Sequence, residues 1–532
     1  MRDRYGAFRH HARTLLHAER SRHCTTSSGP TPLALVYPNS YATGMSSLGY
    51  QTVYRLFNEQ PLIHCERAFV AEGPFADFYH TLESQRPLHA FRIIAFSLAF
   101  EPDYLNALLL LKRAGIPLLW RQRHERDPLI IMGGVTTFYN PAVLASIADC
   151  FFIGEAETMI PVFTSAYEET VLCGGNKEQL LSRLAALPGF YIPALHGINP
   201  VTRVVQRQHL DIAHHPPATS VCVSAQTHLE MFLVEVGRGC GRGCRFCAAG
   251  HVYRPFRFWP QEQILAEVDR YAHAGDRVGL VGAALSDYRE LDQLCTALLQ
   301  RGHKIGLSSL RADRISADLL QALGQSDIQT VTLAPEAGSE RLRRAIHKNL
   351  SDAQIIAAVD RIAQSTIRYL KLYFMIGLPG EREEDLQGIV TLTRELAGRY
   401  LQKGRRELAI SINAFVPKPF TPFQWAGMAT EKEIKRKRAF LQQEFKSISG
   451  LQISRKSVRE ELLQGVLSLG NHELGEQLAD LTQRGTSWND LPAVHADWLH
   501  REKRRDEWLS WQFVDCGQDE ERLWLGWQHA RR

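Results

Sequence analysis

Short apolar runs alternate with segments of helical spacing through the first third of the chain. The runs are bounded by Gly, Pro or polar residues and lie at 33–37, 92–97, 128–132 and 150–154. Residues 48–57 and 104–114 between them have the spacing of amphipathic helices. Strands that alternate with helices predict βαβ units and a parallel sheet. We therefore expect an α/β, doubly wound, Rossmann-like domain over residues 31–195.

The alternation resumes after a polar connection. Residues 196–227 contain three prolines and no sustained period, so we expect them to link two domains. Beyond residue 228, helical spacing recurs at 260–274 and 291–299, and apolar runs predict strands at 231–237, 278–282, 304–308, 330–333, 370–375 and 407–412. About six βα units are too few for a closed eight-stranded barrel. They predict a partial (β/α)6 barrel over residues 228–430.

Strand signals cease beyond about residue 430. Residues 431–445 form a charged segment with helical spacing, and 488–527 are rich in Trp and in both signs of charge. The basic run at 435–438 is flanked by acids, which is typical of a solvated helix face rather than a nucleic-acid site. We expect a helical C-terminal domain over residues 431–532.

The composition is that of a globular protein. Of 532 residues, 45% are hydrophobic and 22% are charged, and the mean hydropathy is -0.22. This balance excludes a mostly disordered chain, a collagen and a small disulfide scaffold. No apolar run approaches the ~18–20 residues of a membrane span, and residues 1–20 lack the apolar core of a secretion signal. We expect a cytoplasmic protein with no membrane partner.

The positive charge is concentrated near the N-terminus. The net charge is +5, and residues 1–23 contain six Arg against two acids, Asp3 and Glu19. A basic arm of this kind can touch nucleic acid, but it is more often a solvated tail. The rest of the chain is nearly neutral and indicates no phosphate-binding face. We therefore expect residues 1–30 to be a solvated basic arm, and we do not expect a nucleic-acid partner.

Three of the ten cysteines are clustered. Cys240, Cys244 and Cys247 form C-x3-C-x2-C directly after an apolar run, with glycines that let a loop wrap closely around a ligand. Three thiolates on one loop can hold three irons of a cubane cluster and leave the fourth iron open. Structural zinc with His251 as the fourth ligand is the alternative, although such sites normally use two separated Cys pairs. The solitary Cys295 lies in apolar context and is expected to be a small buried side chain.

The last cysteine of the cluster is preceded by Phe246, and C-x3-C-x-aromatic-C resembles the signature of the radical S-adenosylmethionine (radical SAM) enzymes. In that family the open iron of a [4Fe–4S] cluster chelates the amino and carboxylate groups of SAM. An electron from the cluster then cleaves a C–S bond to give methionine and a 5′-deoxyadenosyl radical. The resemblance implies Cys240, Cys244 and Cys247 as metal ligands, a partial barrel, and an electron donor of the flavodoxin or ferredoxin type.

The resemblance continues at the ends of the expected barrel strands. It implies that SAM is contacted by Gly282, Ala283, Ala284, Ser308, Arg311, Glu336, Ser339, Arg341, Gly377 and Glu381. Residues 282–284 stand in the place of the turn that meets the amino group of SAM, and 377–381 resemble the adenine-binding strand end. Glu336 stands where the family has a polar residue for the ribose or methionyl end, and Ser339 and Arg341 are candidates for the carboxylate. Taken singly, each is also an ordinary turn or helix start.

The N-terminal domain resembles the cobalamin-binding domain of one radical SAM subgroup. That domain carries DxHxxG, SxL-like and GG elements, which imply Gly44, Ser97, Gly133 and Gly134 as cobalamin-contacting positions here. Tyr41 replaces the cobalt-ligating His, and a Tyr hydroxyl with a pKa of about 10 is a poor cobalt ligand. Any cobalamin is therefore expected to bind without a protein imidazole. The glycine pair is equally a close-packed turn.

These resemblances imply a radical SAM enzyme with an unidentified substrate. If cobalamin is bound, methyl transfer to an unactivated carbon is the natural reaction. One alternative is tRNA methylthiolation, but that group carries a second cluster on three clustered N-terminal cysteines, and Cys24, Cys65 and Cys150 lie far apart. A non-catalytic iron–sulfur or zinc-binding module is the other alternative.

Overall fold

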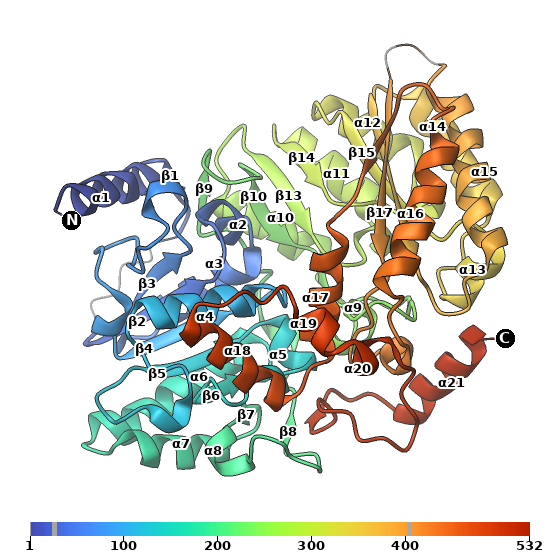
Figure 1. The fold of residues 1–532 in the computed structure, drawn as a ribbon. Coiled ribbons are helices and arrows are strands. Elements are labelled where there is room, and N and C mark those ends of the chain that lie inside the picture. The colour runs from blue at the N-terminus through green and yellow to red at the C-terminus, as the bar shows by residue number, and fades with distance from the viewer. Residues whose placement is uncertain (1, 24–28, 403, 405, 532) are drawn as a thin grey trace. The chain divides into compact units, whose positions relative to one another are not determined.

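The computed structural model describes residues 2–23, 29–402, 404 and 406–531 and is drawn as a ribbon in Figure 1. The chain divides into two compact units. Unit 1 comprises Met1–Phe232, Leu469–Asp490 and Trp508–Gly517, and unit 2 comprises Leu233–Ser468, Leu491–Glu507 and Gln518–Arg532. The expected C-terminal domain over residues 431–532 is therefore divided between the two units. Residues 24–28 of the expected basic arm, with Cys24, lie outside the described residues.

Unit 1 is built on a six-stranded sheet in the order β3-β2-β4-β5-β6-β7. Strands β2 to β6 are parallel, and β7 is antiparallel to β6. The strands are β2 (Thr31–Tyr37), β3 (Ile63–Phe69), β4 (Ile93–Ser97), β5 (Leu129–Gly133), β6 (Cys150–Phe152) and β7 (Phe190–Tyr191). The four strands expected from apolar runs are confirmed. The sequence analysis missed β3, because this strand buries the charged Glu66 and Arg67 and is therefore not an apolar run.

Helices cover both faces of this sheet, which confirms the doubly wound α/β fold (Figure 1). Tyr50 and Phe163 share one apolar core with Leu33 of β2. The next residue of β2, Ala34, is buried on the opposite side, where α4 contacts α18 from the C-terminal part of the chain. The helices concerned are α3 (Leu48–Asn58), α4 (Asp103–Arg113), α6 (Ala156–Tyr167), α7 (Lys177–Ala185) and α18 (His472–Arg484).

The N-terminal arm is folded onto unit 1. It forms α1 (Arg2–His17) and β1 (Glu19–Ser21), and β1 pairs antiparallel with β9 (Cys222–Ser224). Phe8 of α1 is buried. The expectation of a solvated tail is therefore wrong, because α1 has an apolar side that the high Arg content of the segment obscures. The expected linker at 196–227 contributes β9 and lies within unit 1.

The main strands of unit 2 form two sheets of a partial barrel. One has the order β10-β13-β14 and the other the order β15-β16-β17-β18. An isolated parallel bridge between Leu310 and Leu333 connects the end of the first sheet to the second. The strands are β10 (Phe232–Glu235), β13 (Arg277–Val281), β14 (Lys304–Leu307), β15 (Thr330–Glu336), β16 (Tyr369–Ile376), β17 (Glu407–Ala414) and β18 (Leu451–Ser454). The six strands expected from the sequence are confirmed in the expected order.

The expectation that strands end near residue 430 is wrong. Strand β18 pairs in parallel with β17, from Leu408 opposite Leu451 to Ser411 opposite Ser454. Its four residues are largely exposed. The strand is therefore defined by its pairing with β17 rather than by a hydrophobic pattern of its own.

The inner face of the four-stranded sheet is polar. Along β16 the even-numbered residues from 370 to 376 are buried, whereas Lys371, Tyr373 and Met375 are only partly so. Successive side chains of a strand point to opposite faces, so these three side chains face the interior of the barrel. Closed barrels usually fill this space with branched apolar side chains. Here Lys371 and Tyr373 line a cavity instead.

Helices form the outer layer of unit 2. They are α10 (Gln261–Tyr271), α11 (Leu291–Gln300), α12 (Ala317–Gln325), α14 (Asp352–Gln364), α15 (Glu383–Tyr400) and α16 (Glu431–Phe445). No helix in the described part of the chain is long and apolar enough to cross a membrane.

Candidate functional site

The clustered cysteines lie on a loop that begins at the carboxyl end of β10. The short strand β11 (Gly237–Arg238) pairs with β12 (Arg257–Phe258) and closes the ends of this loop. Gly239 has a φ of +84°, and a Cβ at this position would lie 2.2 Å from the carbonyl oxygen of Tyr253. The close approach and the positive φ both require glycine here.

Cys244 is buried, and Cys240 and Cys247 are partly exposed. Arg242, between the first two cysteines, binds the carboxylate of Asp287 through two hydrogen bonds, of which Nε to Oδ2 measures 2.8 Å. The backbone N–H of Arg242 donates to Sγ of Cys240 at 3.5 Å. Asp287 follows β13, so the turn after the neighbouring strand fastens the cysteine loop.

Burial and nearby cations shift the pKa values of the thiols in opposite directions. Burial raises the pKa of Cys244 to about 11, against the lowering effect of Lys348 and Arg311. Burial also raises the pKa of Cys247. Cations near a thiol favour its thiolate form, which is the form that binds metal. Three such thiols on one closed loop fit a cubane cluster, which takes each thiolate on a different iron.

His251 supports the cysteine loop through its ring. Its Nε2 lies 3.2 Å from the carbonyl oxygen of Cys244 and, facing an acceptor, donates to it. The side-chain amide of Gln518 donates to the carbonyl of His251 at 2.6 Å, and burial lowers the pKa of the imidazole to about 4. Among the described residues no group of three His, Cys, Asp or Glu side chains surrounds a single centre. His251 is therefore a neutral side chain whose Nε2 is bonded to the backbone of the cysteine loop.

Several of the expected SAM-contacting positions surround this loop. The turn at 282–284 lies against its start, because a Cβ on Gly282 would be 3.3 Å from the carbonyl oxygen of Gly237. Glu336 pairs with Lys348 at 3.1 Å, and Arg311 donates to the Lys348 carbonyl at 3.3 Å. The turn at 282–284 follows β13, Arg311 follows β14, and Glu336 is the last residue of β15. Parallel barrels carry their active sites at such carboxyl ends.

Ser339 and Arg341 are engaged in helix packing. Ser339 caps α13 (Glu340–Ala345) and donates its hydroxyl to Asp385. Arg341 pairs with the same carboxylate and also donates to the Gly380 carbonyl at 2.8 Å. Because Asp385 is 2% exposed on α15, both side chains join α13 to α15. Neither is directed to the cysteine loop by these contacts.

Glu381 is likewise held by protein side-chain and backbone groups. Its carboxylate pairs with Lys437 of α16 at 2.8 Å and accepts from the Leu378 N–H at 3.2 Å. Burial raises the pKa of Glu381, against the lowering effect of Lys437. Gly377 turns the chain with a φ of +77°, so 377–381 form the turn between β16 and α15. Ser308 is exposed in the turn after β14.

A cavity of about 530 Å³ lies on the inner face of the four-stranded sheet. Its lining includes Glu336 and the polar side chains Lys371, Tyr373, Ser411 and Asn413. The sequence analysis missed the last four as site residues. For Lys371 and Tyr373 the sequence signal was their alternation with the apolar residues Leu370, Leu372 and Phe374. Glu336 connects this cavity to the cysteine loop through its ion pair with Lys348.

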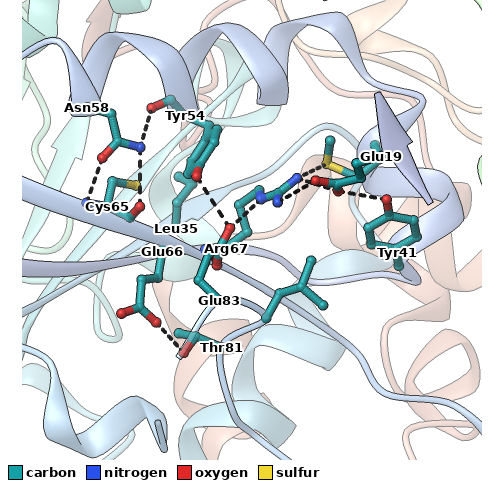
Figure 2. A network of polar contacts seen from close by, with 12 residues as sticks. Glu19, Leu35, Tyr41, Tyr54, Asn58, Cys65, Glu66, Arg67, Thr81 and Glu83 are labelled. Carbon is teal, nitrogen blue, oxygen red and sulfur yellow. Dashed lines mark hydrogen bonds and ion pairs between the residues drawn. The ribbon is translucent and has the colours of Figure 1, made fainter. Parts of the chain in front are cut away.

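The carboxyl edge of the unit 1 sheet holds the positions expected for cobalamin. Tyr41 donates its hydroxyl to Oε1 of Glu19 at 2.7 Å, and Glu19 pairs with Arg67 at 2.7 Å (Figure 2). Arg67 also pairs with Glu83 at 2.6 Å. Burial and the charge of Glu19 raise the pKa of Tyr41 above its usual range. The hydroxyl that replaces the cobalt-ligating His is thus held by an internal network.

The glycine pair forms a close-packed turn. Gly134 has a φ of +109°, and a Cβ there would lie 2.4 Å from the carbonyl oxygen of Leu98. The Leu98 N–H donates to the Gly133 carbonyl at 2.7 Å. Ser97 stands opposite Gly133 in the sheet register, and Gly44 lies on the short helix after β2. Doubly wound sheets bind ligands where the strand order reverses, here between β2 and β4. Position 41 therefore offers no imidazole at this edge, and the Tyr41 hydroxyl is engaged by Glu19.

Two protein-family models match the chain. Residues 49–193 match the model of radical SAM proteins, N-terminal. Residues 234–393 match the model of the radical SAM superfamily. The second range contains the cysteine loop and strands β13 to β16.

Among curated proteins, the chain is 28% identical over 459 residues to the uncharacterized protein MJ0966 of Methanocaldococcus jannaschii, covering 86% of this chain and 92% of that protein. It is 26% identical over 245 residues to the tRNA-2-methylthio-N(6)-dimethylallyladenosine synthase of Chromohalobacter salexigens. That alignment covers 42% of this chain and 52% of the synthase, so it spans about half of that relative.

Among solved structures, the chain is similar to the radical SAM methyltransferase TsrM of Kitasatospora setae with cobalamin and a [4Fe–4S] cluster bound. The TM-score is 0.48 at 11% identity, covering 73% of this chain and 72% of TsrM. Similarity to the cobalamin-dependent SAM radical enzyme OxsB has a TM-score of 0.48 at 13% identity, covering 94% and 79% of the two chains. Through its two family-model matches the chain belongs to the radical SAM superfamily, whose enzymes use a [4Fe–4S] cluster and SAM.

Proposed function

We propose that Cys240, Cys244 and Cys247 each hold one iron of a [4Fe–4S] cluster, and that the enzyme modifies its substrate by methyl transfer. The observation that carries the proposal is the closed loop after β10, which presents three thiols near the cations Lys348 and Arg311. The cluster and SAM, when bound, supply the electron and the 5′-deoxyadenosyl radical of this superfamily. The chain holds the thiols in place through β11, β12 and the Arg242–Asp287 pair.

Glu336 and the turn at 282–284 are the proposed SAM-binding groups. Glu336 ends β15 with a φ of +70°, and Lys348 holds its Oε1 at 3.1 Å. This arrangement leaves the second carboxylate oxygen to accept a hydrogen bond from the ribose or the amino group of SAM. Ser339, Arg341 and Glu381 have a structural role in this proposal, because their partners Asp385 and Lys437 already satisfy them.

Methylthio transfer is the second candidate reaction, and the match to a tRNA methylthio synthase favours it. That chemistry uses a second group of cysteines near the N-terminus. Cys65 and Cys150 are each buried in the unit 1 core, and Cys24 lies outside the described residues. Methyl transfer instead needs a methyl carrier, and the edge of the unit 1 sheet is the proposed site for cobalamin. We therefore favour methyl transfer.

Anaerobic reconstitution with iron and sulfide, followed by reductant and SAM, tests the proposal. We expect the iron content of one cubane cluster and slow release of 5′-deoxyadenosine and methionine without substrate. Reduced flavodoxin or ferredoxin in place of dithionite tests the expected donor.

The variant Cys244→Ala is expected to lose both the cluster and SAM cleavage. The matched control is Cys295→Ala, which replaces a fully buried thiol on α11 and is expected to keep both. Unchanged iron in Cys244→Ala would contradict the ligand assignment. With methyl-labelled SAM and added hydroxocobalamin, failure of the label to reach cobalamin would contradict methyl transfer through that carrier.

A further inference from the structure

Lys371 is a cation that faces the barrel cavity without a carboxylate beside it. It lies on the inner face of β16, and its neighbours in register are the uncharged Thr332 on β15 and Ala409 on β17. Within the described part of the chain, its ammonium contacts the ring of Tyr373, with Nζ 5.1 Å from the ring centroid, and has no ion pair. Keeping a partly buried ammonium from water costs free energy unless an opposite charge compensates.

The Tyr373 ring sets the direction of this ammonium. Tyr373 follows Lys371 by two residues on the same face of β16, so an ammonium over its ring points toward the carboxyl end of the strand. Glu336 stands opposite Phe374 in the register, three residues beyond Lys371. At ~3.3 Å per residue, Lys371 lies roughly 10 Å below Glu336 and forms the floor of the cavity.

Neutral hydrogen-bond donors line the cavity near Lys371. Asn413 donates from Nδ2 to Oγ of Ser411 at 3.4 Å, which leaves the Ser411 hydroxyl proton for another acceptor. Ser454 of β18 also lines the cavity. The acidic side chain in the lining is Glu336, and Lys348 neutralises it at 3.1 Å. The lining also includes the cationic residues Arg455 and Lys456. The cavity therefore offers positive charge and several donors, which is the chemistry that binds an oxyanion.

We propose that the floor of this cavity binds an oxyanion group of the substrate, a carboxylate or a phosphate. Lys371 supplies the charge, and Ser411 and Asn413 supply hydrogen bonds. The inference rests on the proposed function, because it places the substrate in a barrel whose upper end holds SAM beside Glu336. The carboxylate of SAM has the same chemistry, so the experiment must separate the two sources.

The test follows the lysine signals directly. The full-length, reconstituted protein is reductively methylated with ¹³C-formaldehyde, which retains lysine charge, and the Lys371 signal is assigned by its loss in Lys371→Arg. Inorganic phosphate and acetate are titrated in the presence of saturating SAM. We expect a saturable shift of the Lys371 signal, and an affinity for phosphate that falls about tenfold in Ser411→Ala. Lys435 is the internal control, because it is exposed and paired with Glu431.

Two results would overturn the inference. The first is that phosphate and acetate both shift the Lys371 signal no more than they shift the Lys435 signal. The other is a Lys371→Met variant whose SAM affinity falls about tenfold or more, which would make the carboxylate of SAM the occupant. These readouts require no turnover. An anion shift at Lys371 in a protein that never cleaves SAM would contradict the proposed function and leave the anion site standing.

Discussion

The two sheets differ in how the ionisable side chains along their strands are satisfied. In unit 1, Arg67 lies between Glu19 and Glu83, and Tyr41 bonds to the same Glu19 (Figure 2). In unit 2, Lys371 faces a cavity and contacts the Tyr373 ring. The groups around Arg67 satisfy one another, whereas Lys371 leaves a charge for a ligand.

A dense polar network is therefore not by itself a binding site. Removing one member of a buried ion network leaves an uncompensated charge and destabilises the fold. Removing an ionisable group that faces a cavity without such a partner affects ligand binding first. We therefore expect substitutions in the unit 1 network around Arg67 to lower the free energy of unfolding. Substitutions around the cysteine loop should instead lower the cofactor content.

The largest expected effect is the loss of iron when a side chain is added at Gly239 in the cysteine loop. A Cβ in Gly239→Ala would meet the Tyr253 carbonyl at 2.2 Å, so the loop cannot keep its path and the iron content should fall to near zero. The measurement is iron and sulfide analysis after reconstitution. Gly398→Ala is the control, because a Cβ there has no atom within 4 Å. Full iron content in Gly239→Ala would show that loop closure is not needed for the cluster.

The next largest effect concerns Arg67. Arg67→Met leaves the partly buried carboxylates of Glu19 and Glu83 without their buried cation, and breaking such a pair costs about 3–5 kcal/mol. Urea unfolding monitored on unit 1 measures the loss, while iron content should stay unchanged. The control Arg121→Met removes an exposed pair with Glu476 and should cost at most about 1 kcal/mol. Equal losses in the two variants would contradict the stabilising role assigned to the network around Arg67.

A smaller effect is expected from Asp103, which accepts from Nδ2 of Asn39 at 2.9 Å. Burial raises the pKa of Asp103 to about 6. Because this folded-state pKa exceeds the unfolded value of about 4, the stability contributed by the group is present below pH 4 and is lost as pH rises through 6. The loss amounts to about 3 kcal/mol. Unfolding at pH 4.5 and pH 7 should show this slope in the wild type, and Asp103→Asn should reduce it. An identical slope in the variant would rule out Asp103 as its source.

The smallest effect is expected from Tyr41→Phe. Loss of the hydrogen bond to Glu19 should cost about 1.5 kcal/mol in unfolding free energy. Affinity for cobalamin should stay unchanged, because the hydroxyl is held by Glu19. The cobalt EPR spectrum of reduced, cobalamin-loaded protein should show no splitting from a protein nitrogen. Splitting from a histidine nitrogen would disprove the expected coordination.

The strands that could be predicted from the sequence are those that form apolar runs. Apolar runs located β2, β4, β5 and the six expected barrel strands. They could not locate β3, which buries Glu66 and Arg67, or β18, which is exposed and depends on pairing with β17. Both strands depend on partners distant in the sequence, which a local pattern does not contain.

The sequence predicted those site residues whose place in the barrel follows from the order of the motifs along the chain. Glu336 and the turn at 282–284 follow barrel strands and therefore lie near the cysteine loop. Ser339 and Arg341 follow the same logic, yet Asp385 of α15 binds both of them. Spacing alone cannot reveal that competing partner. Lys371 lay in no motif, and only the alternation along β16 places it inside the barrel.

Unit 1 is assembled from segments that are far apart in the sequence, which has a consequence for folding during synthesis. Its sheet is encoded early, but Lys112 of α4 donates to the Thr482 carbonyl at 2.7 Å, and Asn140 donates to the Gly470 carbonyl at 2.9 Å. On the ribosome, the face that α18 covers must therefore wait until nearly the whole chain has emerged. During that interval an apolar surface is exposed to other nascent proteins, which is when misassembly threatens large chains. A chaperone that shields the α4 face until residue 490 has been made would act at this stage of synthesis.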